Sequence, residues 1–228
     1  MASRPLPRPR PDAVRGRRAC AGRGGCGGRT GGTYDPRIDI LVLCTGNQCR
    51  SPMGEVLLRD RLARVGVDAE VRSAGLVSEG APASPNGVKV MAKRGLDLSA
   101  HRSQKLTPDA VAHADLVLGM AREHVREAVV LDPASLAKTF TMRELARRAE
   151  RTGPRRPGPD GGLEPMADWL ARVGAGRRAA DLLGTSTDDD VADPIGLSKR
   201  TYERTAQEIE DLVTTIVRHA FPVPAGRP

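Results

Sequence analysis

The first regular pattern along the chain is a run of β-branched and aliphatic residues at positions 38–43, typical of a strand buried on both faces. A tight polar loop follows at 44–52, and apolar residues at helical spacing then run from 53 to about 65. Ser51 stands where it could cap this helix, and Pro52 suits the first turn. The pattern predicts a strand, a loop and a helix, in that order.

Strand and helix patterns alternate through the rest of the chain. Further strands are predicted at 69–73, 114–119 and 138–141, and helices at 85–94, 107–112, 121–130, 143–151, 166 to about 183, and 198–219. Such alternation indicates an α/β fold with a mostly parallel sheet and helices on both sides. No apolar run approaches the ~18 residues of a membrane span, so we expect a soluble protein that does not bind membranes.

Charge divides the chain into two parts. The formal net charge of +8 is concentrated in residues 1–34, which carry eight Arg and one Asp, whereas the remainder has a net charge of +1. We predict that 1–36, rich in Arg, Gly and Pro, is a disordered tail and that 37–228 form the folded domain. Nucleic acid is not expected as a partner of the domain, because its basic residues are balanced. Two interpretations of the tail remain open, a solvated extension, which is favoured, and a tether to nucleic acid or acidic surfaces.

The chemistry is concentrated in the loop at 44–51, which reads CTGNQCRS. A loop that curls between a strand and a helix can turn its N–H groups inward as a nest for an oxyanion, and the helix N-terminus adds partial positive charge. Arg50 can bind two oxygens of one anion through its planar fork. In such surroundings Cys44 is stabilised as a thiolate, and a thiolate can attack phosphorus to form a phosphocysteine.

A proton donor for the departing oxygen is also required, because an alkoxide or phenolate is a poor leaving group. The candidate is Asp193, which precedes Pro194 in a segment that could reach over the loop. Residues 188–190 are also aspartates, but they are interpreted as a solvated acidic run. The four histidines are scattered without metal-ligand spacing, so they are taken as structural or surface residues, and no metal is expected.

At this point a resemblance to a known family is evident. The stretch LVLCTGNQCRSP resembles the signature C-x-G-N-x-C-R-S-P of the low-molecular-weight protein tyrosine phosphatases, including their actinobacterial-type members. Ser-Ala-Gly at 73–75, Met-Ala-Arg-Glu-His at 120–124 and Asp-Pro at 193–194 extend the match over nearly all of 38–221. The resemblance implies a flavodoxin-like three-layer fold with a four-stranded parallel sheet, and a cytoplasmic phosphatase that needs no cofactor and acts on phosphorylated proteins.

The resemblance also implies roles for individual residues. Cys44 would be the nucleophile, Arg50 would bind the phosphoryl group, and Asp193 would act first as acid and then as base. The residues expected to bind substrate or hold the loop are Thr45, Gly46, Asn47, Gln48, Cys49 and Ser51. Cys49 matches a family cysteine that forms a reversible disulfide with the nucleophile, a hypothesis that mass spectrometry after peroxide treatment would test.

Two positions leave the substrate open. Family members that favour phosphotyrosine usually have an aromatic residue after Asp-Pro, whereas this chain has Ile195. Each lost ring contact is worth about 0.5–1.5 kcal/mol beyond area burial. Gln48 stands where tyrosine-directed relatives often have an aliphatic residue and phosphoarginine-directed ones a threonine. Phosphotyrosine is favoured as the commoner family activity, and phosphoarginine remains the alternative.

The connection into the Asp-Pro segment is longer than the family's usual one, which indicates an insertion at about 152–188. Trp169, the only tryptophan, lies within it. One interpretation makes this segment a lid over the pocket. The favoured interpretation is an amphipathic helix that packs on the domain edge through Met166, Trp169, Leu170 and Val173.

Two further activities compete with the phosphatase interpretation. Arsenate reductases share this fold, but those coupled to thioredoxin need relay cysteines downstream, and this chain has none after Cys49. A non-catalytic module that binds phosphoproteins would be expected to lack the thiol or the acid. Because Cys44, Arg50 and Asp193 are all present, catalysis is favoured over binding alone. The oligomeric state does not follow from the sequence.

Overall fold

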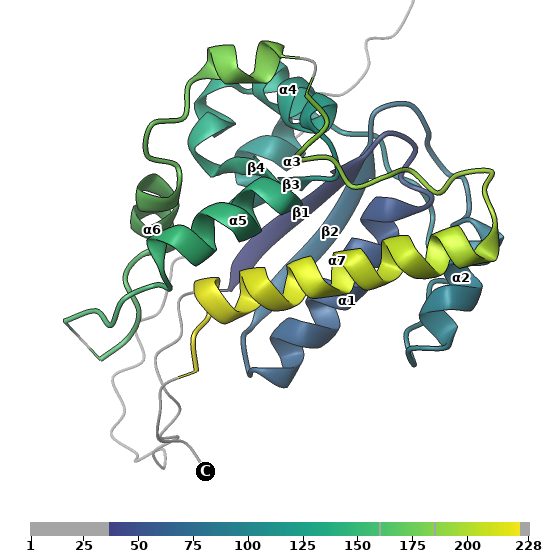
Figure 1. Cartoon of the computed structure of the whole chain (residues 1–228), viewed down its shortest axis with the longest axis horizontal. Helices are drawn as coiled ribbons and strands as arrows, with labels where there is room; N and C mark the ends of the chain where they lie inside the picture. The colour runs from purple at the N-terminus through teal and green to yellow at the C-terminus, as the bar shows by residue number, and fades with distance from the viewer. Residues whose placement is uncertain (1–36, 160, 185, 224–228) are drawn as a thin grey trace, which may run out of the picture. The chain divides into compact units, whose positions relative to one another are not determined.

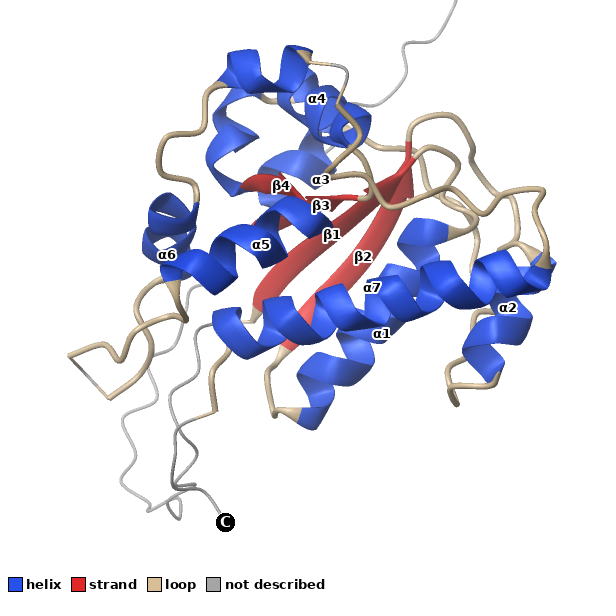
Figure 2. Cartoon of the chain, in the orientation of Figure 1, coloured by secondary structure: helices blue, strands red, loops and turns tan. Residues whose placement is uncertain are grey.

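The computed structural model describes residues 37–159, 161–184 and 186–223. The predicted tail at 1–36 lies outside these residues. Four strands form one parallel sheet in the order β2-β1-β3-β4 (Figure 2): β1 Ile38–Cys44, β2 Ala69–Gly75, β3 Leu116–Gly119 and β4 Thr139–Thr141. The predicted α/β fold with a parallel sheet is therefore confirmed.

Helices cover both faces of this sheet. The α-helices are α1 Arg50–Arg64, α2 Pro85–Ala92, α3 Pro108–His113, α4 Arg122–Leu131, α5 Met142–Thr152, α6 Met166–Val173 and α7 Lys199–Ala220, and two short 3₁₀ helices are η1 Pro133–Lys138 and η2 Ala179–Leu183. In Figure 1, α1 and α7 lie together against one face of the sheet, and the two helices are in contact.

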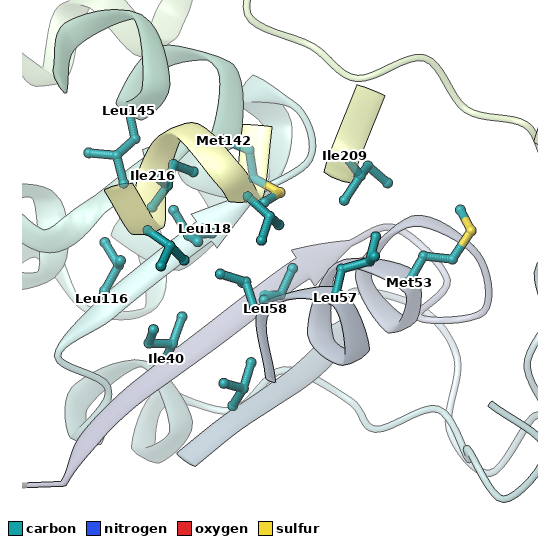
Figure 3. Close-up of a cluster of buried hydrophobic side chains, with 14 of the residues drawn as sticks. Ile40, Met53, Leu57, Leu58, Leu116, Leu118, Met142, Leu145, Ile209 and Ile216 are labelled. Atoms are coloured by element: carbon teal, nitrogen blue, oxygen red, sulfur yellow. The ribbon is translucent and has the colours of Figure 1, made fainter. Parts of the chain in front are cut away.

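Alternation along β1 assigns its side chains to the two faces. Ile40 and Val42 join the larger core with α1, α5 and α7, where side chains from these helices, β1 and β3 point toward one another (Figure 3). Leu41 and Leu43 pack in a smaller cluster with residues of α3 and α4. Because β1 is buried on both faces, its end is fixed in place, and Cys44 is the last residue of that strand.

The strand order determines where a ligand can bind. The chain continues from β1 to β2 on one side and crosses back to β3 on the other side of β1. The loops that follow β1 and β3 therefore meet at the carboxyl edge, joined by the Met120 N–H that donates to the Leu43 carbonyl at 2.9 Å. In open α/β sheets, such a switch point is the usual ligand site.

The insertion contains two short helices rather than the one predicted from 166 to about 183. α6 ends at Val173, and the chain then turns through Gly174 and Gly176. The φ of Gly176 is 79°, a left-handed conformation that glycine adopts readily and that ends a helix. Trp169 is fully buried, and its indole N–H donates to the Gly153 carbonyl at 3.1 Å. The four apolar residues singled out in α6 are all buried, as the packed-helix interpretation predicts.

Candidate active site

Backbone hydrogen bonds turn the loop at 44–51, here called the cysteine loop, into a cradle. Three of its carbonyls accept hydrogen bonds from outside: Thr45 from the Leu76 N–H, Asn47 from the His101 ring and Gln48 from the Ser84 N–H, each at 2.8 Å. By contrast, the N–H groups of residues 46–49 donate no hydrogen bond to any described part of the chain. These amides and the N-terminus of α1 are suited to bind an oxyanion.

Asn47 holds the shape of the cradle from within. Its φ of 47° is left-handed, a conformation that asparagine tolerates better than most residues. Its side-chain amide donates to Ser51 Oγ at 2.9 Å and to Ser73 Oγ at 2.8 Å, while its oxygen accepts from the Gln104 N–H at 2.8 Å. The end of β2 can approach the loop closely because Gly75 has no side chain. A Cβ at this position would lie only 2.8 Å from the Asn47 backbone nitrogen.

Ser51 faces the sulfur of Cys44 instead of capping α1. The helix begins at Arg50, with Cys49 at the N-cap and no side-chain cap, so the predicted capping role of Ser51 is wrong. Its hydroxyl donates to Cys44 Sγ at 3.0 Å. The side chains of Ser51 and Asn47 are fully buried behind the cysteine loop, so they support it rather than line the pocket.

Arg50 is buried and held on two sides. Its Nη1 donates to the Val191 carbonyl at 3.1 Å, and its Nη2 contacts Asp193 Oδ2 at 2.5 Å and Thr45 Oγ1 at 3.4 Å. Its Nε is buried without a hydrogen-bond partner among the described residues. This arrangement fixes the guanidinium plane and leaves two N–H donors, on Nε and Nη1, without a partner among the described residues.

Asp193 reaches the cysteine loop although 143 positions separate it from Arg50. Its Oδ1 accepts the Ile195 N–H at 3.0 Å, a turn that suits a residue followed by proline. Asp193 lines the same pocket, of about 300 Å³, as Cys44. The thiol, the guanidinium and the carboxylate selected from the sequence therefore lie together.

The aspartates at 188–190 are not the solvated acidic run expected from the sequence. Asp189 receives two hydrogen bonds from Arg147 Nη2, both 2.9 Å long, and Asp190 Oδ1 accepts the Arg122 N–H at 2.8 Å. Both are half-buried, and only Asp188 is exposed. Their hydrogen-bond partners lie on α4 and α5, about 40 to 70 positions away. Three consecutive aspartates in the sequence therefore do not indicate these contacts.

His124 was expected to be a structural or surface residue, but it is buried against the cysteine loop. Its Nδ1 accepts the Ala121 N–H at 2.9 Å, so in the neutral ring Nε2 carries the proton and donates to Thr45 Oγ1 at 3.0 Å. The Thr45 hydroxyl in turn donates to Glu123 Oε1 at 3.1 Å. Thr45 thus connects the start of α4 to Arg50. His124 is a polar residue that follows the strand predicted at 114–119, at the carboxyl edge of the sheet. This position is the signal that could have indicated its contact with Thr45.

Burial, together with the positive charge of Arg50, lowers the pKa of His124 to about 3. Unfolded histidine titrates near 6.5, so between these values the unfolded chain binds a proton that the folded protein excludes. We expect the free energy of unfolding to decrease as the pH is lowered below about 6.5. His124 should contribute about 1.4 kcal/mol per pH unit to this decrease. Above that pH His124 contributes no slope.

The test compares urea unfolding of the wild type and His124→Gln at several pH values between 7 and 5. The variant should show a shallower loss of stability toward acid, because glutamine does not titrate. The exposed His113, replaced by Gln, is the matched control and should retain the wild-type slope. Equal slopes for the wild type and His124→Gln would contradict the assignment.

Cys49 is the second thiol of the cysteine loop, and its environment differs from that of Cys44. Its Sγ lies 3.0 Å from the Tyr202 hydroxyl, and the residue is buried. Burial raises the pKa of the Cys49 thiol, and burial with the Cys49 contact raises the pKa of Tyr202 to about 12. Both groups therefore stay protonated at neutral pH. Both cysteines of the loop are free, and a disulfide between them under oxidation stays a prediction.

Both polar and aliphatic side chains line the pocket. Gln48 Nε2 donates to Ser78 Oγ at 3.3 Å, and the exposed side chains of Val77 and Ile195 also line the pocket. A Cβ on Gly46 would make ordinary van der Waals contacts with Gln48 Nε2 at 3.7 Å and Ser78 Oγ at 3.9 Å, both of which belong to residues that line the pocket. Among the residues that the structure describes, no aromatic ring lines this pocket.

Other features of the described residues do not compete with this site. A larger cavity of about 800 Å³ runs along the β2 edge, but it contains neither Cys44 nor Asp193. Within the described residues, no cluster of three or more His, Cys, Asp or Glu side chains is suited to hold a metal ion. None of the helices described is both long enough and apolar enough to span a membrane.

Known proteins share the sequence and the fold. A family model described as low molecular weight phosphotyrosine protein phosphatase matches residues 39–159. A probable low molecular weight protein-tyrosine-phosphatase, EpsP of Ralstonia solanacearum, is 44% identical over 107 residues, which are 46% of this chain and 71% of that protein. The protein-arginine-phosphatase of Bacillus subtilis is 29% identical, over 79% of this chain and 95% of its own length.

The solved structures include the low molecular weight protein tyrosine phosphatase from T. tengcongensis. It superposes with a TM-score of 0.59 at 31% identity and covers 79% of this chain and 98% of its own. The structural similarity therefore covers more of this chain than the family model, which matches residues 39–159.

Proposed function

Because the chain belongs to the low molecular weight phosphotyrosine protein phosphatase family, we propose that it hydrolyses phosphotyrosine in proteins through a phosphocysteine formed on Cys44. The observation that carries this proposal is a thiol and a carboxylate in one pocket, beside four amides that make no bond to the described chain. The Arg50 guanidinium lines the same pocket and adds charged donors. Together these groups would bind the three outer oxygens of a phosphoryl group.

In the first step the Cys44 thiolate attacks phosphorus, and the bond from phosphorus to the tyrosine oxygen breaks. The Asp193 carboxyl gives its proton to that oxygen, so tyrosine leaves as a neutral phenol. Arg50 and the loop amides stabilise the charge on the equatorial oxygens in the transition state. The phosphoryl group is then bound to sulfur.

In the second step water attacks the phosphocysteine, and the Asp193 carboxylate accepts a proton from that water. The bond from sulfur to phosphorus breaks, and inorganic phosphate is released. The Ser51 hydroxyl, 3.0 Å from Cys44 Sγ, donates to the sulfur as it leaves with the electron pair. The cycle ends with the thiolate restored.

Phosphoarginine is the second candidate substrate. The polar pair of Gln48 and Ser78 lines the pocket with Val77 and Ile195, and none of the described residues that line it is aromatic. A guanidinium leaving group has N–H donors that could use the Gln48 or Ser78 oxygens, whereas a phenol ring would gain little from them. The protein-arginine-phosphatase of Bacillus subtilis, at 29% identity, supports this alternative.

A hydrolysis panel tests the substrate directly. Phosphotyrosine, phosphoarginine and phosphoserine peptides are compared by phosphate release, with arsenate-dependent thiol consumption measured alongside. We expect phosphotyrosine to be hydrolysed with the highest kcat/KM and phosphoserine to be nearly inert, because its alkoxide leaves least readily. A higher kcat/KM for phosphoarginine would select the alternative, and arsenate reduction without hydrolysis would overturn both.

The expected partners are phosphorylated proteins, and the expected location is the cytoplasm. A catalytic thiol must remain reduced to act, and the reducing cytoplasm keeps cysteines as thiols. The free Cys44 and Cys49 thiols are consistent with this location.

A further inference from the structure

Asp190 lies where the segment that carries the acid meets the start of α4. We propose that Asp190 is a positioning residue for Asp193, a role that rests on the proposed function of Asp193 as the acid. Residues 186–198 leave the vicinity of α4 and run toward the start of α7 (Figure 1). Asp190 fixes the point from which residues 191–193 extend over the cysteine loop.

Asp190 supplies a hydrogen-bond acceptor at the N-terminus of α4, where the side chain of the N-cap residue has none. The N-cap residue of α4 is Ala121, which has no polar side chain to accept the first amides of the helix. The His124 ring accepts the Ala121 N–H, and Asp190 Oδ1 accepts the next, that of Arg122, at 2.8 Å. A carboxylate is favoured here because the N-terminus of a helix has partial positive charge.

Val191 transmits this anchor to the catalytic arginine. Its N–H donates to the Met120 carbonyl at 2.7 Å, its carbonyl accepts from Arg50 Nη1 at 3.1 Å, and its side chain is buried. Asp190 itself closes a turn, since its N–H donates to the Thr187 carbonyl at 2.9 Å. Asp190 is thus bound to the start of α4, and Val191 is bound both to Met120, which follows β3, and to Arg50.

Asp193 has few contacts of its own that could define its position. Its carboxylate contacts only Arg50 Nη2 and the Ile195 N–H among the described residues, and its side chain is 38% exposed. A phosphoryl group bound to Arg50 would compete for the first of these contacts. The position of the acid in the reacting complex therefore depends on the backbone at 190–191, where Asp190 provides the side-chain anchor.

The three adjacent aspartates offer a matched experiment. Asp190→Ala removes the anchor, and Asp188→Ala is the control. Among the described residues the Asp188 carboxylate accepts a hydrogen bond only from Ser186 in its own turn, and Arg143 binds the Asp188 backbone carbonyl. kcat/KM is measured for a series of aryl phosphates with increasingly basic leaving groups. Vanadate inhibition is measured for each variant as a readout of the cradle.

Asp190→Ala should reduce kcat/KM by about tenfold to a hundredfold for the most basic leaving groups, the size of effect expected when a catalytic group is misplaced by about 1 Å. For the most acidic leaving groups, which need no proton, the rate should be nearly unchanged, as should vanadate inhibition. Asp190→Asn keeps an acceptor for the Arg122 N–H and should restore most of the rate. Asp188→Ala should match the wild type throughout.

Two results would overturn the proposal. One is equal behaviour of Asp190→Ala and Asp188→Ala across the series. The other is an equal loss for every leaving group together with weaker vanadate inhibition, which would indicate a merely structural role. If Asp190→Ala does not fold, Asp190→Glu, which displaces the acceptor by one methylene, carries the same test. Asp193→Asn in the same series separates the proposals: if it shows no dependence on the leaving group, the proposed function itself fails.

Discussion

Replacing Cys44 by serine is expected to abolish turnover while the cradle still binds vanadate or phosphate. The serine hydroxyl is neutral at pH 7 and is both a weaker nucleophile and a poorer leaving group than a thiolate, so both chemical steps slow. The loss should be on the order of 10⁴-fold or more, as is usual when a covalent nucleophile is removed. The unbonded amides at 46–49 and Arg50 remain, which is why binding of the anion should survive.

The measurement combines steady-state rates with rapid quenching of the wild type, in which phosphorus should be trapped on Cys44. Cys49→Ser is the comparison variant, since Cys49 lies in the same loop but its sulfur faces Tyr202 at 3.0 Å. It should retain measurable turnover and form the same phosphocysteine. Persistent turnover by Cys44→Ser, or a phosphoryl group trapped only on another residue, would refute the covalent mechanism.

The second large effect is expected for Asp193→Asn. The amide cannot give a proton to the leaving oxygen, so hydrolysis of substrates with basic leaving groups should slow by ~10²–10⁴-fold. The asparagine oxygen can still accept the Ile195 N–H, so the turn at Pro194 should be kept. The effect therefore reports the missing proton rather than a displaced loop.

The test measures kcat/KM against leaving-group basicity for the wild type and Asp193→Asn. The variant should lose most on phenyl phosphate and least on aryl phosphates with strongly electron-withdrawing substituents. Asp188→Asn is a suitable control because Asp188 is exposed and its carboxylate accepts a hydrogen bond from Ser186 in its own turn. An unchanged rate for basic leaving groups would remove Asp193 from the role of acid.

Much of the fold could be predicted because its signals are local. The aliphatic run that becomes β1 and the glycine, asparagine and proline that follow it specify a strand, a turn and a helix within 27 residues, Ile38–Arg64. Element types were correct for the strands and for the predicted helices, but the helix predicted from 166 to about 183 ends at Val173. Its apolar spacing favours a continuous helix, but Gly174 and Gly176 end α6 and the next turn is 3₁₀.

The supporting contacts of the site could not be predicted in the same way. Ser51 has the residue type and position of a helix cap, yet the carbonyl of Cys49 accepts from the Met53 N–H and the helix starts earlier. Its hydroxyl is then free for Cys44. His124 and Asp190 act through partners 79 and 68 positions away, and neither belongs to a periodic pattern that would indicate burial.

The sequence by itself determined where the cysteine loop lies and which chemical groups it carries, because the residues that form it are contiguous and follow a recognisable strand. Only the tertiary structure decided what surrounds that loop. Packing of the helices on the parallel sheet brings Asp193 to Arg50 across 143 positions and Tyr202 to Cys49 across 153. Such contacts arise from the burial of whole helix and sheet faces, and no short stretch of sequence encodes them.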